Sequence, residues 1–314
     1  MKMNLSEVPS RVVIVVLNMD TSMVGKKIGP YTVEKRTADD SIYGENIQDR
    51  LIRHADTYAL MEILQAFQDD RFMTFECNQK GTDFNTMGLK MLSDALLLFK
   101  PSDFHLSYSM CFNESGAGGS TSIIFPVLNR RKKMHNLSLS DDELFQLKTF
   151  REKIQRRCKL EEVHKEIKPR VSQMIDLYNN AMYAFPDFLQ FLQYIMIFEQ
   201  AAMVDKEMTY RISRNIALLL GNDVEECIFI EKEIKGLYGI RSAITHGRNS
   251  RVEYEDVVKA RDYACRLIRK LIEIGIVGDM GREYTNSGYG SFNPKTKDEE
   301  QMYNAIEVKS NPWI

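Results

Sequence analysis

The stretch Lys232-Glu-Ile-Lys-Gly-Leu-Tyr-Gly-Ile-Arg-Ser-Ala-Ile-Thr-His-Gly-Arg248 carries the clearest structural pattern in the chain. Placed at about 100° per residue, its apolar side chains and those just before it fall on one broad face of a helix. That face comprises Ile230, Ile234, Leu237, Ile240 and Ile244. Gly247 is a typical first residue beyond a helix, so we expect the helix to end at His246.

Arg241 lies within this apolar face, one heptad after Ile234. A guanidinium in such a position has a large desolvation cost unless it is paired. Arg241 therefore requires a carboxylate, a second chain or a bound phosphate. His246 lies about 140° further round the helix and at its end, where backbone carbonyls point outward. This pair of residues is unusual in a helix with a purely structural role.

A series of helices surrounds this stretch. Ser140-Asp-Asp-Glu143 is a capping box, which marks a helix start. From there the apolar spacing predicts helices near 141–158, 160–182, 187–204, 206–221, 224–246 and 254–276. Pro169 lies inside the second of these, which is then either two helices or one kinked helix. Asp223 is placed to cap the fifth. Short connections between the helices indicate an all-α bundle over residues 140–277.

Residues 1–139 combine strand and helix patterns and predict a separate α+β domain. Strands are expected at 11–17, after the Gly-Pro turn at 29–30, at 104–112 and at 121–128, with helices at 56–67 and 89–99. Pro126 places the last strand at a sheet edge. The glycine-rich segment 114–120 precedes a strand, which favours a hairpin loop over a phosphate-binding loop. Residues 278–314 are polar and are expected to form a loosely ordered tail.

The charge balance excludes one broad function class. The net charge is −2 and the pI is about 6.3, so the chain is not a general electrostatic binder of nucleic acid. A nucleic-acid site must then be local. One candidate is a basic cluster near the end of the first domain, which is either a solvated linker or a set of phosphate contacts that position RNA. It comprises Arg130, Arg131, Lys132 and Lys133.

The five cysteines are widely spaced and odd in number, which indicates a reduced protein of the cytoplasm. The longest strongly apolar run near the N-terminus, Val12–Leu17, is too short for a signal sequence or a membrane span, so no membrane association is expected. Neither the cysteines nor the histidines show ligand spacing. We therefore expect no metal and no cofactor.

Three segments, in this order along the chain, carry a family resemblance. Phe191-Leu-Gln-Tyr-Ile-Met-Ile-Phe-Glu-Gln200 resembles an apolar helix that ends in Leu-Glu, with Phe198 in the place of the leucine. Arg211-Ile-Ser-Arg-Asn-Ile-Ala-Leu-Leu-Leu-Gly221 resembles the segment Arg-x-Ala-Leu-Leu-Leu-Gly. Leu237-Tyr-Gly-Ile-Arg-Ser-Ala-Ile-Thr-His-Gly247 resembles Leu-Tyr-x-x-Arg-x-x-x-x-His-Gly. Together they resemble the ApeA-like branch of HEPN domains over about residues 140–276. Residues 1–139 are only loosely similar to regions that precede such domains.

The resemblance implies a metal-independent endoribonuclease that acts as a homodimer. In HEPN domains the R-x4–6-H helices of two protomers face each other, and the two Arg/His pairs form one composite cleft. Many members act in phage defence, as toxins or in stress responses, and the ApeA-like branch is linked to abortive infection. The R-x4-H residues of this chain are Arg241 and His246.

The two residue types suit RNA cleavage without a metal, in which the substrate's own 2′-OH is the nucleophile. Histidine titrates near neutral pH, so His246 can serve as general base or acid. Arginine stays charged and binds phosphate through two donors, so Arg241 can stabilise the transition state. The five helical steps between them span about 7.5 Å along the axis. One protomer's pair therefore need not converge on one phosphate, which independently favours a dimer.

Neighbouring residues have both structural and functional interpretations. Glu199 either forms a buried ion pair with Arg214 or orients Arg241. Tyr238 is either a core or interface aromatic or a base-stacking residue. Ser242 and Thr245 either bond a phosphate or bond back to backbone carbonyls. The remaining two, Arg248 and Arg251, are either phosphate contacts or surface charges.

Two other hypotheses remain open at this point. The second half could be a non-catalytic HEPN module that binds RNA or nucleotide, or that only dimerises. The first half could be a sensor of a phage or host ligand that controls the nuclease, which is compatible with the main hypothesis. A structural account of Arg241 and His246 alone is an ion-paired arginine beside a histidine at a helix end.

Overall fold

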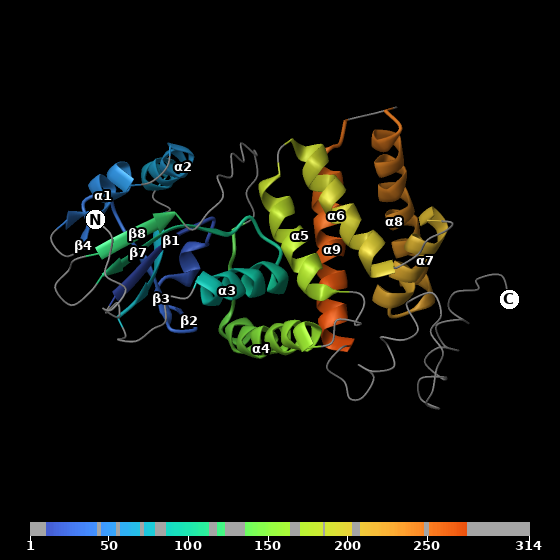
Figure 1. Ribbon diagram of the computed structural model, residues 1–314, viewed down its shortest axis with the longest axis horizontal. Coiled ribbons are helices and arrows are strands. Elements are labelled where there is room, and N and C mark those ends of the chain that lie inside the picture. The colour runs from blue at the N-terminus through green and yellow to red at the C-terminus, as the bar shows by residue number, and fades with distance from the viewer. Residues whose placement is uncertain are drawn as a thin grey trace. The chain divides into compact units, whose positions relative to one another are not determined.

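A computed structural model describes residues 11–42, 45–54, 57–69, 72–78, 86–112, 118–122, 136–163, 170–184, 186–202, 208–247 and 251–274. The chain divides into two compact units, residues 1–151 and 152–314. The first contains an antiparallel sheet with helices and the second is helical (Figure 1). The expected layout of an α+β part followed by a helical part is confirmed. None of the helices in the described residues is long and apolar enough to cross a membrane.

The first unit is built on a six-stranded sheet with the strand order β2-β3-β6-β1-β7-β8. Each neighbouring pair in it is antiparallel. The six strands are β1 (Arg11–Leu17), β2 (Lys27–Ile28), β3 (Tyr31–Lys35), β6 (Met73–Cys77), β7 (His105–Phe112) and β8 (Gly118–Ser122). A separate small sheet pairs β4 (Ser41–Ile42) with β5 (Glu45–Asn46). The helices are the short η1 (Thr21–Met23), α1 (Ile47–His54), α2 (Thr57–Gln68) and α3 (Thr86–Phe99).

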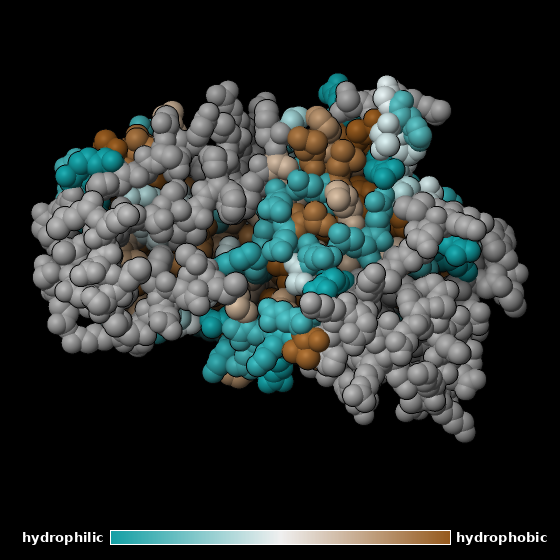
Figure 2. All heavy atoms as spheres, in the orientation of Figure 1, coloured by the Kyte–Doolittle hydropathy of each residue, from teal (hydrophilic) through white to brown (hydrophobic). Residues whose placement is uncertain are grey.

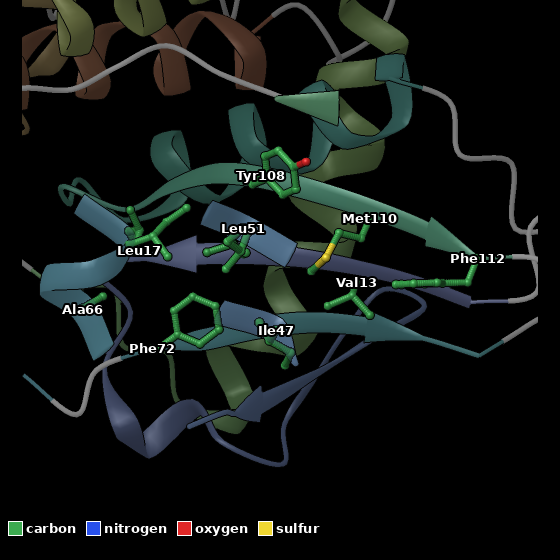
Figure 3. Packing of buried hydrophobic residues seen from close by; sticks show 11 residues of the cluster. Val13, Leu17, Ile47, Leu51, Ala66, Phe72, Tyr108, Met110 and Phe112 are labelled. Carbon is green, nitrogen blue, oxygen red and sulfur yellow. The ribbon is translucent and has the colours of Figure 1, made fainter. Parts of the chain in front are cut away.

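Strand β1 lies in the middle of the sheet, between β6 and β7, and is almost entirely buried. In its register, Val13 lies opposite Glu76 on one side and Met110 on the other. The side chains on this face of β1 pack against α1 and α2 in one buried cluster (Figure 3), while α3 lies on the other face (Figure 1). The cluster comprises Val13, Val15, Leu17, Ile47, Leu51, Ile63, Ala66, Phe72, Tyr108, Met110 and Phe112.

The β-branched run at 11–17 is the buried strand that its sequence predicts. Strand β6 has no counterpart among the sequence predictions, although all five of its residues are buried. Its short sequence, Met73-Thr-Phe-Glu-Cys77, alternates apolar and polar residues as a strand does, and this signal was overlooked. The predicted hairpin of β7 and β8 forms, and β8 is an edge strand. This strand begins at Gly118, inside the segment expected to be the loop, and residues 123–130 lie outside the described part.

Helix α4 (Asp141–Val163) begins with the predicted capping box. The Ser140 amide donates to Glu143 Oε2 at 2.8 Å, and the Glu143 amide donates to Ser140 Oγ at 3.1 Å. The predicted break between 158 and 160 is wrong, because α4 continues through it. The physical reason is the ion pair of Arg157 Nε with Glu161 Oε1, at 2.9 Å, which spans the expected break one helical turn apart.

The compact units divide inside α4, whereas the sequence predicts a boundary at 139/140. The start of α4 is tied to the first unit. Lys26 Nζ lies 2.9 Å from Asp141 Oδ1, and Lys100 Nζ donates to the Ser138 carbonyl at 2.7 Å. The rings of Phe99 and Phe150 lie with their centroids 5.8 Å apart. These contacts explain why the first part of α4 belongs to the first unit.

The second unit contains five further helices in its described part. They are α5 (Val171–Tyr183), α6 (Asp187–Ala202), α7 (Met208–Leu220), α8 (Val224–Thr245) and α9 (Tyr254–Ile274). Helix α6 packs against α5, α7 and α9, and α7 packs along α8 (Figure 1). Helix α9 is buried over most of its circumference. The predicted tail, 278–314, lies outside the described residues.

Candidate functional site

Helix α8 begins and ends where its sequence predicts. The Asp223 carboxylate caps it by accepting from the Glu226 amide at 2.8 Å. At the other end His246 is the last residue of the turn, with φ −90° and ψ 8°. Gly247 follows at φ +66°, a left-handed conformation that favours glycine, and its amide donates to the Ile244 carbonyl at 3.0 Å. The helix therefore presents His246 at its end, where this side chain is exposed.

The apolar face of α8 is covered only in part. Ile230, Ile234 and Leu237 are buried as predicted, whereas Ile240 and Ile244 remain half-exposed. Helix α7 runs antiparallel to α8, since Cys227 Sγ contacts the Ala217 carbonyl while Arg214 pairs with Glu231. With 13 residues against 22, α7 covers the first part of α8 and not its last turns. The last turns of α8, which carry Arg241 and His246, therefore leave part of the apolar face open.

Arg241 is paired inside the chain, with a carboxylate of α6. Its Nη2 lies 3.0 Å from Glu199 Oε1, and the two side chains are 31% and 23% exposed. The Tyr238 hydroxyl donates to the same oxygen at 3.0 Å. The Arg241 guanidinium also lies over the Tyr238 ring, 5.4 Å from its centroid. Three groups from two helices thus meet at one carboxylate oxygen.

The electrostatics of this cluster appear in the pKa of Tyr238, which is raised above its usual value of 10.0. Burial is the largest cause, because it disfavours the phenolate. The negative charge of Glu199 and the hydrogen bond to it act in the same direction, and Arg241 opposes them. Tyr238 is therefore a neutral hydrogen-bond donor at physiological pH.

The alternative ion pair of Glu199 with Arg214 does not form and is corrected here. Arg214 Nη1 lies 3.9 Å from Glu231 Oε2, and its guanidinium lies 5.6 Å from the centre of the Tyr210 ring. Arg214 faces α8 from α7, near the middle of the first half of α8. Glu199 is instead near the end of α6, close to the last turns of α8. The second interpretation, that Glu199 holds Arg241, describes the contact that the structure contains.

Two other predicted residues of α8, Thr245 and Tyr238, follow their structural interpretations. Thr245 Oγ1 donates to the Arg241 carbonyl at 2.9 Å, a bond back to the backbone one turn earlier. The two alternatives for the Ser242 hydroxyl stay predictions, since the bond from the His246 amide to the Ser242 carbonyl, at 3.1 Å, involves only the backbone. Tyr238 is only 4% exposed and one face of its ring is covered by a guanidinium, so it is a core residue and not a base-stacking one.

The predicted basic contacts remain largely untested by the structure. Arg251 is exposed and pairs with Glu253 at 2.8 Å. Arg248 lies outside the described residues, as does the cluster at 130–133. Within the described part no group of three or more His, Cys, Asp or Glu residues is arranged to hold a metal ion.

The bond from Tyr238 to Glu199 is the feature of the site that sequence reasoning missed. Two signals pointed to it. Tyr238 and Arg241 are three residues apart on one helix, so they share a side of it. Glu199 follows an apolar run of α6, Tyr194-Ile-Met-Ile-Phe198, where a carboxylate needs partners.

Comparison of the chain with models of protein families, with curated proteins and with solved structures finds no match. The resemblance to HEPN domains therefore rests on the three sequence segments quoted above.

Proposed function

We propose that this chain is a metal-independent endoribonuclease of the HEPN type, with Arg241 and His246 as its catalytic residues. The observation that carries the proposal is the open end of α8, where a half-exposed guanidinium and an exposed imidazole share one helix end. A histidine and an arginine can supply the proton transfer and the charge stabilisation that metal-free RNA cleavage needs. Three family-like segments in the right order raise this above a chance pair.

In the proposed reaction the 2′-OH of one nucleotide attacks the adjacent phosphorus. His246 takes the proton of that hydroxyl as general base, or gives one to the leaving 5′-oxygen as general acid. The P–O5′ bond breaks as the new P–O2′ bond forms, which leaves a 2′,3′-cyclic phosphate and a 5′-hydroxyl. Arg241 donates to the phosphoryl oxygens, whose charge increases in the five-coordinate transition state. An arginine has five N–H donors, so the contact of Arg241 Nη2 with Glu199 leaves donors for phosphate.

The surface of α8 supports a homodimer in which the two motif helices face each other. Ile228 and Phe229 are 49% and 61% exposed. Gly236 and Gly239 are exposed in the helix interior, and a Cβ added at either would meet nothing within 4 Å. Each interior glycine costs about 1 kcal/mol relative to alanine, and the close approach of a second helix offsets that cost. By helical spacing this side of α8 also carries His246.

Apolar surface is also present elsewhere on the helical unit. Figure 2 shows it (brown) between hydrophilic surface (teal) over these helices. The exposed large apolar side chains of helices α6 to α8 are Leu189, Met196, Tyr210, Val224, Ile228 and Phe229. Their number is consistent with a further protein surface against this unit.

The resemblance supports a wider role in phage defence, abortive infection or a stress response in the cytoplasm, with RNA as substrate. The sheet-containing first unit is then the candidate sensor of a phage or host ligand. The alternative is a module that binds RNA or nucleotide without cutting it.

The test is cleavage of RNA by the full chain in the presence of EDTA. Wild type should produce ends with a 2′,3′-cyclic phosphate, while Arg241→Ala and His246→Ala should each lower the rate by about 100-fold or more. Arg266→Ala is the matched control, since this arginine of α9 is also half-exposed and ion-paired, with Glu226 at 3.1 Å. Equal cleavage by all variants contradicts the catalytic assignment. RNA that is bound but never cut favours the binding module, and a loss of cleavage with EDTA contradicts the metal-free mechanism.

A further inference from the structure

We propose that Glu199 and Tyr238 are positioning residues that fix the orientation of Arg241 for catalysis. This inference rests on the proposed ribonuclease function and concerns the same site. Neither residue needs to touch RNA, because both act through the guanidinium.

The geometry restrains Arg241 in two independent directions. Glu199 Oε1 holds the Nη2 end of the guanidinium at 3.0 Å. The guanidinium lies over the Tyr238 ring, with its central carbon 5.4 Å from the ring centre. An arginine side chain otherwise samples many rotamers, so a contact at one edge and a contact on one face together select one orientation. The remaining N–H donors then have a defined direction at the open end of α8.

Tyr238 also fixes the carboxylate that fixes the arginine. Its hydroxyl donates to the same oxygen that Arg241 contacts, at 3.0 Å. Tyr238 is buried, and its pKa is raised, so the hydroxyl keeps its proton and its role as donor. The phenol therefore prevents the Glu199 carboxylate from rotating freely between alternative positions. Tyr238 thus orients the Glu199 carboxylate, and Glu199 orients Arg241.

The negative charge of Glu199 opposes the binding of RNA. Its removal therefore affects binding and cleavage differently, which distinguishes a positioning role from a simple structural role. The negative charge of Glu199, 3.0 Å from Arg241, weakens the attraction of the Arg241 side chain for a phosphate in the ground state. Orientation matters most in the transition state, where the phosphoryl charge is greatest. Removing the charge of Glu199 should therefore leave RNA binding as tight as before, or tighter, while the chemical step becomes slower.

A purely structural ion pair predicts a different pattern. Loss of such a pair lowers the folded fraction of the protein, which reduces binding and cleavage in the same proportion. A separation of the two quantities is therefore diagnostic of positioning.

The experiment measures two quantities for the full-length chain and its variants. The first is the single-turnover cleavage rate of a short RNA, and the second is the dissociation constant of the same RNA with 2′-O-methyl groups, which removes the nucleophile. Glu199→Gln should slow cleavage about 10- to 100-fold with binding unchanged or stronger, in line with the cost of a misplaced catalytic group. Tyr238→Phe retains the ring under Arg241 and removes only the hydroxyl, so its rate should fall less, by roughly 3- to 10-fold.

Controls separate this inference from the proposed function. Arg241→Ala should lower cleavage and also weaken binding, and thermal unfolding should confirm that each variant is folded. Wild-type cleavage rates in Glu199→Gln and Tyr238→Phe, beside a loss in Arg241→Ala, overturn the positioning roles and leave the ribonuclease proposal intact. A fall of the cleavage rate and of RNA binding by the same factor in these variants also overturns the positioning roles and leaves the ribonuclease proposal intact. Cleavage that survives in Arg241→Ala and His246→Ala, or a wild type that cuts no RNA, overturns the proposed function and the positioning roles with it.

Discussion

At the scale of single residues, the first unit contains a buried carboxylate, that of Glu76, to which two arginine side chains are hydrogen-bonded. Glu76 of β6 is 6% exposed. Arg36 binds it through two nitrogens, with Nε at 2.7 Å from Oε1 and Nη2 at 2.9 Å from Oε2. Arg11 Nη2 adds a contact of 2.7 Å to Oε2, and Thr74 Oγ1 donates to Oε1 at 2.8 Å. Burial raises the pKa of Glu76, but these hydrogen bonds together outweigh it and hold the pKa below its usual value of 4.5.

We therefore expect Glu76→Gln to destabilise the first unit by roughly 2–4 kcal/mol, because the two arginines lose their shared counter-charge. The measurement is unfolding in urea. A pKa that is lowered in the folded state stabilises the fold above the usual pKa and loses this effect as the pH falls. The difference between wild type and variant should accordingly shrink as the pH falls below 4.5.

The matched control is Glu34→Gln on the neighbouring strand β3, a half-buried carboxylate that should change stability by less than about 0.5 kcal/mol. A destabilisation by Glu76→Gln that is the same at pH 3 and at pH 7 would show that packing, and not charge, is the cause.

At the scale of elements, one helix supplies the cap of the next. Arg170, the residue before α5, makes no side-chain cap. The cap comes instead from Glu161 of α4, whose carboxylate accepts from the Val171 amide at 2.8 Å and the Ser172 amide at 3.0 Å. Glu161 is 1% exposed and also binds Arg157. A carboxylate at a helix start also interacts favourably with the helix dipole.

We expect Glu161→Gln to lower the free energy of unfolding by about 3–5 kcal/mol, because it leaves the buried Arg157 without this counter-charge and weakens the cap. Glu162→Gln is the matched control, since Glu162 is the next residue and is exposed. Chemical denaturation monitored by helical circular dichroism measures both. Equal stabilities of the two variants would contradict a capping role for Glu161.

The distance along the chain over which a signal acts explains which elements of the fold could be predicted from the sequence. Local signals placed β1, the capping box of α4 and both ends of α8, because caps, turn glycines and β-branched runs act within a few residues. Strand β6 was missed although its residues alternate between apolar and polar. Only the burial of its polar side chains depends on neighbours that are distant in the sequence. The break inside α4 was predicted wrongly because the pair of Arg157 with Glu161 favours continuity, and that pair is strong only when both residues are buried.

At the scale of the whole molecule, the proposed dimer makes a prediction that no single-chain site shares. Arg241→Ala and His246→Ala are each expected to be inactive alone. If each catalytic pair combines Arg241 of one protomer with His246 of its partner, the cleft of a mixed dimer contains one intact pair out of two. Random exchange makes about half of the dimers mixed, so the mixture should recover about a quarter of the wild-type rate.

This experiment uses the two variants after co-refolding or co-expression, with each variant alone as the baseline and with the mass of the dimer measured in solution. Cleavage that stays at the baseline in mixed dimers would place both residues of a site in the same protomer. A strict monomer that still cleaves RNA at the wild-type rate would contradict the composite site.

The sequence by itself determined the order of the two parts, the helical nature of the second, the limits of α8 and the identity of Arg241 and His246 as candidate residues. These features follow from local periodicity, caps and residue chemistry. Only the tertiary structure decided which arginine pairs with Glu199, since Arg214 and Arg241 were both possible partners along the chain. It also decided that Tyr238 joins the same oxygen and that the last turns of α8 are left half-exposed. The physical reason is that pairing and exposure depend on how helices distant in sequence pack, and α7 is too short to cover the whole of α8.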